Sequence, residues 1–270
     1  MTLVHALRCL RGVAVRESLR FIGQRGRFFS ALVRPLVWLF IFAAGFRSVL
    51  GISIIPPYET YILYEEYITP GLLGMILLFS GMQSSLSMVY DREMGSMSVL
   101  LTTPLPRWYL LLCKLLAGVF VAVIQAYVFL LIAWFWDIRP PIAGYFAVLP
   151  ALIATGLMFG ALGLLLFSLI KQLENFAGVM NLVIFPMFFA SSALYPLWKM
   201  EESSLLLYWL CAINPFTQGV ELIRYALYGK FNGLALLVVS ICSLFFLTAA
   251  VIGYDPSRRF LTKKLGASKA

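Results

Sequence analysis

The chain has 270 residues, of which 61% are hydrophobic and only 12% are charged. A soluble domain of this size carries about 25% charged residues, so the polar side chains are too few to cover a water-facing surface, and the composition indicates a protein that lies in lipid. The net charge of +9 would suggest nucleic acid in a soluble protein. Here the placement of the charges matters more than their sum, and we expect no nucleic-acid partner.

The N-terminal segment, residues 1–30, is expected to hold an amphipathic helix in the membrane interface. Within residues 3–22 the apolar side chains share one narrow stripe at 100° per residue, while most arginines lie elsewhere around the helix. The arginines would face anionic lipid headgroups, which makes membrane lipid a predicted partner. An ordinary cytoplasmic helix packed on protein is the alternative.

Six apolar stretches have the length of a membrane-spanning helix. They cover about residues 32–50, 67–90, 109–136, 142–170, 176–193 and 234–254. Arg34 and Arg47 are expected near the ends of the first stretch, where long side chains can reach the interface. The sequence therefore predicts one all-α integral membrane domain over residues 1–270, with six transmembrane helices.

Residues 194–233, between the fifth and sixth spans, are apolar but are interrupted by prolines and charged residues. One long span does not fit this pattern. Two short re-entrant helices that enter the membrane from one side fit it better, because irregular backbone at that depth must be covered by protein.

The lysines and arginines predict the orientation of the spans. Six spans place both chain ends, including the tail at residues 255–270, on the same side, together with most of the 21 lysines and arginines. The opposite side holds only Arg47, Arg139, Lys199, Arg224 and Lys230. The positive-inside rule then predicts a multi-pass protein of the inner (cytoplasmic) membrane with both termini in the cytoplasm.

Motifs for catalysis or nucleotide binding are missing from the sequence. It lacks a phosphate-binding G-x-x-x-x-G-K-[ST] loop, and His5 is its only histidine. The four cysteines have no metal-type spacing. We therefore expect no catalytic residues, cofactor or metal. The spans also lack the acidic residues that ion-coupled carriers place at mid-membrane, so energy for transport would come from a partner.

Three stretches resemble the ABC-2 family of exporter permeases, in the branch of nodulation-factor and daunorubicin-type drug permeases. They are YITPGLLG (67–74), DREMGSMSVLLTTPLPRWYLLLCK (91–114), and FPMFFASSALYP (185–196) followed by NPFTQGVELIRYALYG (214–229). The resemblance covers essentially the whole chain. It implies a permease subunit that is not itself an enzyme, with ATP and Mg²⁺ bound by a separate ATP-binding-cassette ATPase. It also implies a second permease copy, for which a homodimer is expected.

The resemblance also implies roles for two segments. Residues 91–107 would form a coupling helix that docks on the ATPase, and an apolar ridge spaced i, i+3, i+7 suits such an interface. The expected contact residues are Asp91, Arg92, Glu93, Met94, Met97 and Leu101. A cytoplasmic hairpin that binds nothing is the alternative. The external segment would cap the exit, with Asn214, Pro215, Glu221 and Arg224 as its marked residues, and Glu221 could pair with Arg224 at i, i+3.

Two further patterns bear on packing. The tyrosines at 58, 61, 64 and 67 predict an aromatic belt at the outer interface, with a stacking surface for a sugar-containing substrate as the alternative. Gly156, Gly160 and Gly163, together with the serine-rich GMQSSLSM (81–88), predict close helix contacts. For the function, an intramembrane lipid- or glycan-modifying enzyme and a secondary carrier remain alternatives to the ATP-driven exporter.

Overall fold

The computed structural model describes residues 25–42, 56–58, 62–95 and 106–254, together with Arg8, residues 11–16, Leu19 and Gly23. The predicted interface helix, the second half of the first span and the C-terminal tail fall largely outside these residues. The described elements are helices: α2 (Arg25–Val37), η1 (Trp38–Phe42), α4 (Tyr64–Glu93), α6 (Arg107–Phe135), α7 (Ile142–Leu169), α8 (Leu173–Phe189), α9 (Leu197–Ser203), α10 (Leu205–Ile213), α11 (Pro215–Leu227) and α12 (Gly233–Gly253).

Within the described ranges, four helices are long and apolar enough to cross a membrane: α4, α6, α7 and α12. They match the second, third, fourth and sixth predicted spans. The helix α8, predicted over 176–193, has 17 residues and ends at Phe189. At its end the side-chain amide of Asn214 donates to the carbonyls of Met187 and Ala190, which supplies partners for carbonyls that a helix end leaves free.

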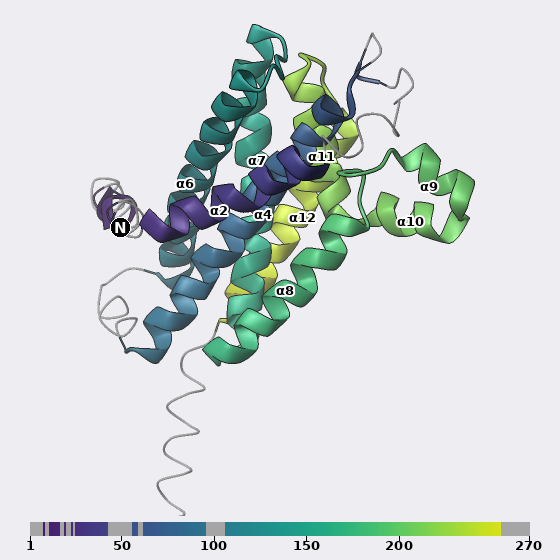
Figure 1. Cartoon of the computed structure of the whole chain (residues 1–270). Coiled ribbons are helices and arrows are strands. Elements are labelled where there is room, and N and C mark those ends of the chain that lie inside the picture. Colours follow the sequence, from purple (N-terminus) through teal and green to yellow (C-terminus); the bar gives the residue numbers. More distant parts are fainter. Residues whose placement is uncertain are drawn as a thin grey trace, which may run out of the picture.

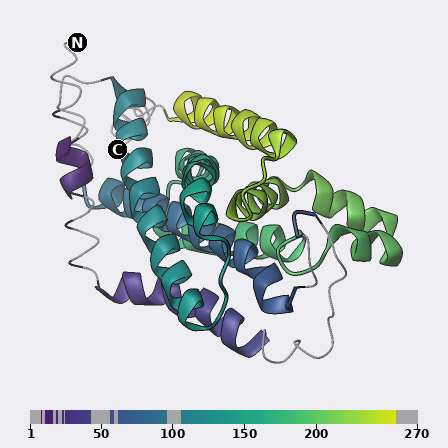
Figure 2. The ribbon, with the colours of Figure 1, turned by 90° about the horizontal axis from the view of Figure 1, so that it is seen from above.

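The long helices form a bundle in which α7 packs against α4, α6, α11 and α12 (Figure 1). Seen from above, α12 and α2 lie at opposite edges of the bundle (Figure 2). The central helix α4 is buried along most of its length, whereas α12 buries only Ala235, Val239 and Ala250. The apolar residues on the rest of α12 therefore face outward, as expected for a helix against lipid.

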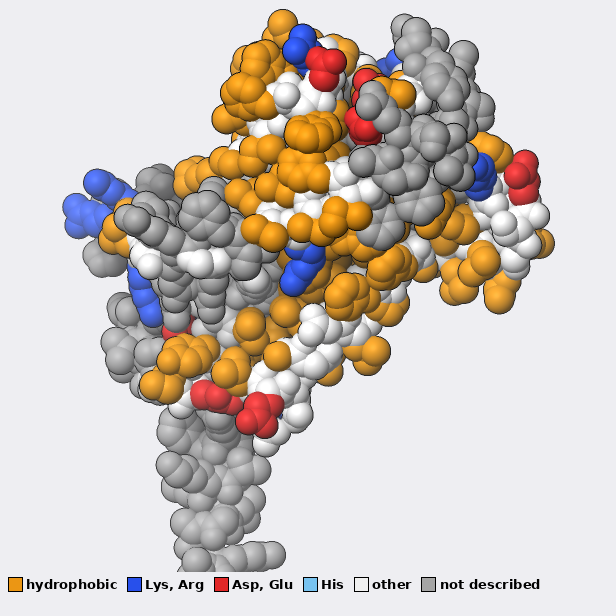
Figure 3. All heavy atoms as spheres, in the orientation of Figure 1, with side chains coloured by type: hydrophobic (Ala, Val, Ile, Leu, Met, Phe, Trp, Pro, Cys, Tyr) orange, Lys and Arg blue, Asp and Glu red, His pale blue; other side chains and the backbone are white. Residues whose placement is uncertain are grey.

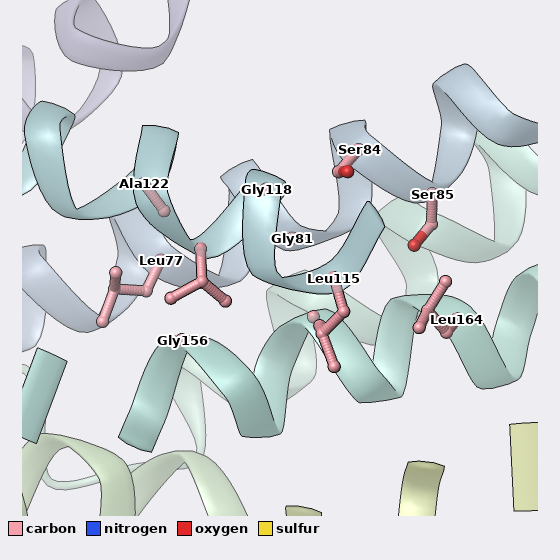
Figure 4. Close-up of a pocket in the computed structure, with 11 residues that line it drawn as sticks. Leu77, Gly81, Ser84, Ser85, Leu115, Gly118, Ala122, Gly156 and Leu164 are labelled. Atoms are coloured by element: carbon pink, nitrogen blue, oxygen red, sulfur yellow. The ribbon is translucent and has the colours of Figure 1, made fainter. Parts of the chain in front are cut away.

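Small residues bring α4, α6 and α7 close together, as predicted. A Cβ atom on Gly81 would lie 3.0 Å from the backbone nitrogen of Gly160, and one on Gly163 would lie 2.6 Å from Oγ of Ser85. Figure 4 shows these helices meeting around a small cavity lined by Ser84, Ser85 and leucine side chains. The glycine spacing and the serine-rich stretch thus serve helix packing.

The segment between α8 and α12 forms three helices, so the prediction of two was wrong. The backbone is extended at Ser204, which divides α9 from α10, and Asn214-Pro215 divides α10 from α11. The amphipathic helix α11 packs inside the bundle against α4, α7 and α12. By contrast, α9 and α10 project sideways from the bundle (Figure 1).

Candidate functional sites at the two ends of the bundle

The C-terminal end of α4 carries a buried ion pair to α6. The Nζ of Lys114 donates to Oδ2 of Asp91 at 3.0 Å, and the two side chains are 6% and 4% exposed. A guanidinium nitrogen of Arg16 lies 3.7 Å from the same carboxylate oxygen. Two opposite charges buried together hold each other in place, because either one alone would lack its partner in a poorly solvated site.

The next residue, Arg92, binds the C-terminal end of α7. Its guanidinium donates to the backbone carbonyls of Phe167, Ile170 and Lys171. The same group lies over the ring of Phe167, with 4.6 Å between Cζ and the ring centroid. A cation at a helix C-terminus satisfies carbonyls that have no partner within the helix and interacts favourably with the helix dipole.

The residue after that, Glu93, binds the start of α8. Its Oε1 accepts a hydrogen bond from the backbone N–H of Leu173 at 2.8 Å. Here a side chain from another helix satisfies one of the free N–H groups at the beginning of α8. The end of α4 is therefore joined to α6, α7 and α8 by three consecutive residues, an arrangement that we call the α4–α7–α8 junction.

The predicted coupling-helix residues thus divide into two groups. Asp91, Arg92 and Glu93 belong to the α4–α7–α8 junction and make contacts within the chain. Met94 follows the last turn of α4 and is 66% exposed. Met97 and Leu101 lie outside the described residues, so the apolar ridge stays a prediction.

At the other end of the bundle, Arg224 on α11 is 2% exposed and forms the predicted ion pair with Glu221. The backbone carbonyl of Ser192 accepts a hydrogen bond from Nη2 of Arg224 at 2.8 Å. The hydroxyl of Ser192 donates to the Glu221 carboxylate at 2.7 Å. Ser192 thus connects the loop after α8 to both charged residues of α11.

The tyrosines complete this arrangement from α4 and the segment before it. Tyr67 donates to the carbonyl of Ser192 at 2.9 Å, and its ring lies 4.2 Å from Cζ of Arg224. Tyr64 donates to the carbonyl of Leu194 at 3.1 Å. The ring of Tyr58 packs edge-on against Tyr228, and burial raises the pKa of the Tyr58 phenol to about 12.

The prediction of an aromatic belt was wrong for Tyr58, Tyr64 and Tyr67, since all three are at most 5% exposed. Tyr64 and Tyr67 face protein because the loop after α8 offers them free carbonyls, and the guanidinium of Arg224 offers Tyr67 a cation. Tyr58 is covered by ring contacts with Tyr67 and Tyr228. Buried to this extent, they also present no stacking surface for a sugar. Tyr61 lies outside the described residues.

Asn214 and Pro215 form the start of α11. The Asn214 side-chain oxygen accepts from the N–H of Phe216 at 2.9 Å, while its amide nitrogen donates to Met187 and Ala190. Pro215 occupies the first turn, where a missing N–H costs nothing. We call this set, with Tyr58, Tyr64, Tyr67, Ser192, Glu221, Arg224 and Tyr228, the α11 anchor. Sequence reasoning missed Ser192, for which the only signal was its place in FASSALYP.

The surface between these two ends is mostly apolar. Figure 3 shows hydrophobic side chains covering much of the described front face, with acidic and basic side chains at its upper and lower ends and on its flanks, and a basic side chain near its middle. Among the described residues no group of His, Cys, Asp and Glu side chains is arranged to hold a metal ion. An apolar surface between two polar ends suits a membrane domain, in which polar contacts join neighbouring helices at each end of the bundle.

Comparison with known proteins gave consistent results. A family model described as "ABC-2 type transporter" matches residues 9–228. The chain is 29% identical over 210 residues to the "Putative transport permease ycf38" of Cyanophora paradoxa, covering 73% of this chain and 66% of that protein. It is 31% identical over 163 residues to the "Probable multidrug ABC transporter permease YbhR" of Escherichia coli (strain K12), covering 59% of this chain and 44% of that protein. The chain thus spans less than two thirds of the length of these relatives.

Proposed function

The chain belongs to the ABC-2 type transporter family, and from this premise we propose that it is the membrane-spanning permease subunit of an ATP-driven exporter. It is a multi-pass membrane protein and a transporter component. ATP hydrolysis takes place on a separate ATP-binding-cassette subunit, which binds ATP and Mg²⁺. Two copies of the permease face each other in the cytoplasmic membrane, each with six spans and both termini in the cytoplasm.

The observation that carries this proposal is the α4–α7–α8 junction. Residues 91–93 bind the end of α7 through Arg92 and the start of α8 through Glu93. A force applied to the chain just after α4 is therefore transmitted to two other spans at once. An ATPase that pushes this segment can shift the permease between two states only if its contacts differ between them, and rigid attachment converts a local push into helix movement.

The docking surface itself is proposed to begin at the exposed Met94 and to continue along Met97 and Leu101. Methionine side chains are flexible and polarisable, which suits an interface that has to rock during the ATPase cycle. An exposed apolar ridge on a water-facing loop also favours a partner over free solvation.

At the opposite end, we assign the α11 anchor to closing the external exit. Three residues marked in the sequence, Asn214, Glu221 and Arg224, connect α11 to α8, to the loop after it and to α4. The fourth, Pro215, occupies the first turn of α11. The buried charge pair and the tyrosine hydrogen bonds keep α11 in one position until the bundle rearranges. Opening the exit would then require the charge pair and the tyrosine hydrogen bonds to break at the same time.

The experiment is purification of the tagged full chain from its native membrane in mild detergent, followed by identification of what comes with it. We expect an ATP-binding-cassette protein in about equal amount, lost from Met97→Asp and Met94→Asp. Ser203→Asp, on the exposed end of α9, is the control and should retain it.

Two results would contradict the proposal. If Met97→Asp and Met94→Asp both kept the ATPase, the docking surface would be wrong. If no nucleotide-binding protein came with the unmodified chain even after cross-linking, the exporter proposal itself would fail.

A further inference from the structure

One arginine lies far from both ends of the bundle. The guanidinium of Arg34, on α2, lies over the ring of Phe79, with 3.9 Å between Cζ and the ring centroid. Phe79 is near the middle of the 30-residue helix α4. At a rise of 1.5 Å per residue, it is about 20 Å from either end of α4. The charged group itself, and not only its aliphatic stem, is therefore near the middle of the bundle.

This position corrects the sequence-based expectation for Arg34. It was expected near the end of the first span, where its head group could reach the interface. The ring of Phe79 holds the head group at mid-depth, where hydrocarbon surrounds a membrane protein. A charge there is costly, and an ionisable residue at such depth is by default a candidate functional site.

Arg34 also lacks a countercharge. Among the described residues no carboxylate lies within ion-pair distance of it, and its side chain is exposed. Two acidic residues of the bundle are paired with other cations, Asp91 with Lys114 and Glu221 with Arg224. A guanidinium has five N–H donors at its edge. The ring of Phe79 contacts only the flat face of the group, so these donors remain available to a ligand.

The surroundings of Arg34 are apolar. Val33, Val37 and Ile41 are exposed on the same helical segment, which continues into the five-residue π-helix η1. Single turns of π-helix are rare and often occur at functional sites. Trp38 of η1 packs on Phe188 and Phe189 of α8.

On α8 this apolar surface continues with the exposed residues Leu182, Phe185 and Phe189. The guanidinium of Arg34 thus lies beside an apolar surface built by the described side chains of α2, η1 and α8.

We propose that Arg34 is the anion-binding group of a site for an anionic amphiphile. Its planar fork fits two oxygens of a phosphate or carboxylate at once, and the adjoining apolar surface takes the hydrocarbon part. This inference rests on the proposed function, because in an exporter permease the amphiphile at mid-depth is the transported class of substrate. Both halves of such a molecule find a complementary surface here, the anion on Arg34 and the chain on Val37, Ile41 and α8.

The test uses the full chain in phosphatidylcholine nanodiscs with two photoactivatable probes. One is a phosphatidic acid and the other a phosphatidylcholine, with the same diazirine-bearing acyl chain. We expect the phosphatidic acid to label peptides of α2, η1 and α8 preferentially. Arg34→Gln should reduce this labelling about tenfold or more, the loss expected for a charge-assisted bidentate contact, and Arg34→Lys should reduce it less.

The chain offers a matched control for Arg34→Gln. Arg139 is also exposed and also lies over an aromatic ring, that of Trp134, but it follows the last turn of α6. Arg139→Gln should leave the labelling unchanged. Thermal unfolding of each variant checks that it is folded, and Arg34→Lys keeps the test decisive if Arg34→Gln is unstable.

Inorganic phosphate at millimolar concentration separates an amphiphile from a free anion. If it does not compete with the phosphatidic acid probe, the amphiphile is supported. Competition would show a site for free phosphate and overturn the proposal, as would equal labelling by the two probes or labelling that survives in Arg34→Gln. None of these results depends on the ATPase, so failure here is distinct from failure of the exporter proposal, which copurification tests.

Discussion

Replacing Lys114 with methionine should destabilise the bundle, because it leaves Asp91 buried without its main partner. At the observed 3.0 Å separation and an effective dielectric constant of about 20, the attraction between the two charges is about 5.5 kcal/mol. Desolvation of the two ions costs several kcal/mol each, so the intact pair contributes little on balance. Removing one partner is different and costs about 3–5 kcal/mol for a buried pair. Arg16, at 3.7 Å and 41% exposed, offsets part of this loss, so we expect about 3 kcal/mol.

The assay is thermal unfolding in detergent with a thiol-reactive fluorophore. Cys113 and Cys211 are buried and react only when the chain opens, once Cys9 and Cys242 have been changed to serine. A loss of about 3 kcal/mol in a chain of this length lowers Tm by on the order of 10 °C. The matched variant is Asp91→Leu/Lys114→Met, which removes both charges and should recover most of the lost stability.

Two outcomes would refute this reasoning. If Lys114→Met unfolded at the same temperature as the unmodified chain, the carboxylate at the end of α4 would not depend on the lysine. If the double variant were as unstable as the single one, loss of packing rather than an unpaired charge would explain the effect.

Three further predictions concern backbone packing and caps, each measured against the unmodified chain in the same thermal assay unless stated. Gly144→Ala should destabilise by about 1–3 kcal/mol, because its Cβ would lie 1.8 Å from the carbonyl oxygen of Leu227, whereas Gly178→Ala, with nothing within 4 Å, should be neutral or slightly stabilising. Asn214→Ala should cost about 2 kcal/mol, and Asn214→Asp should recover only part of it, since it keeps the acceptor for α11 but loses the donors to α8. Arg92→Lys keeps the positive charge but loses the planar guanidinium that donates to three carbonyls at the end of α7. It should therefore speed hydrogen exchange in the α7–α8 connection while leaving exchange in α12 unchanged.

Four of the predicted spans correspond to long apolar helices, α4, α6, α7 and α12. They could be predicted from the sequence because hydropathy over about 20 residues is a local property of the chain. α6, α7 and α12 begin and end within two residues of their predicted bounds. The pairing of Glu221 with Arg224 was likewise local, since residues three apart on a helix are neighbours. The close contacts of Gly160 and Gly163 followed from spacing alone, because only small residues allow helix backbones to approach so closely.

Long-range contacts decided the rest. Tyr67 was expected in an aromatic belt at the outer interface, but it is buried and donates a hydrogen bond to the carbonyl of Ser192, a residue 125 positions away. Arg92 binds carbonyls at the end of α7 across more than 70 residues of chain, a contact that the sequence did not predict. Arg34 was expected at the interface and lies over Phe79 instead. A sequence shows which side chains can bind a carbonyl or a ring, but only the packing of the helices determines which carbonyl or ring each one meets, because these partners are brought together by folding rather than by spacing.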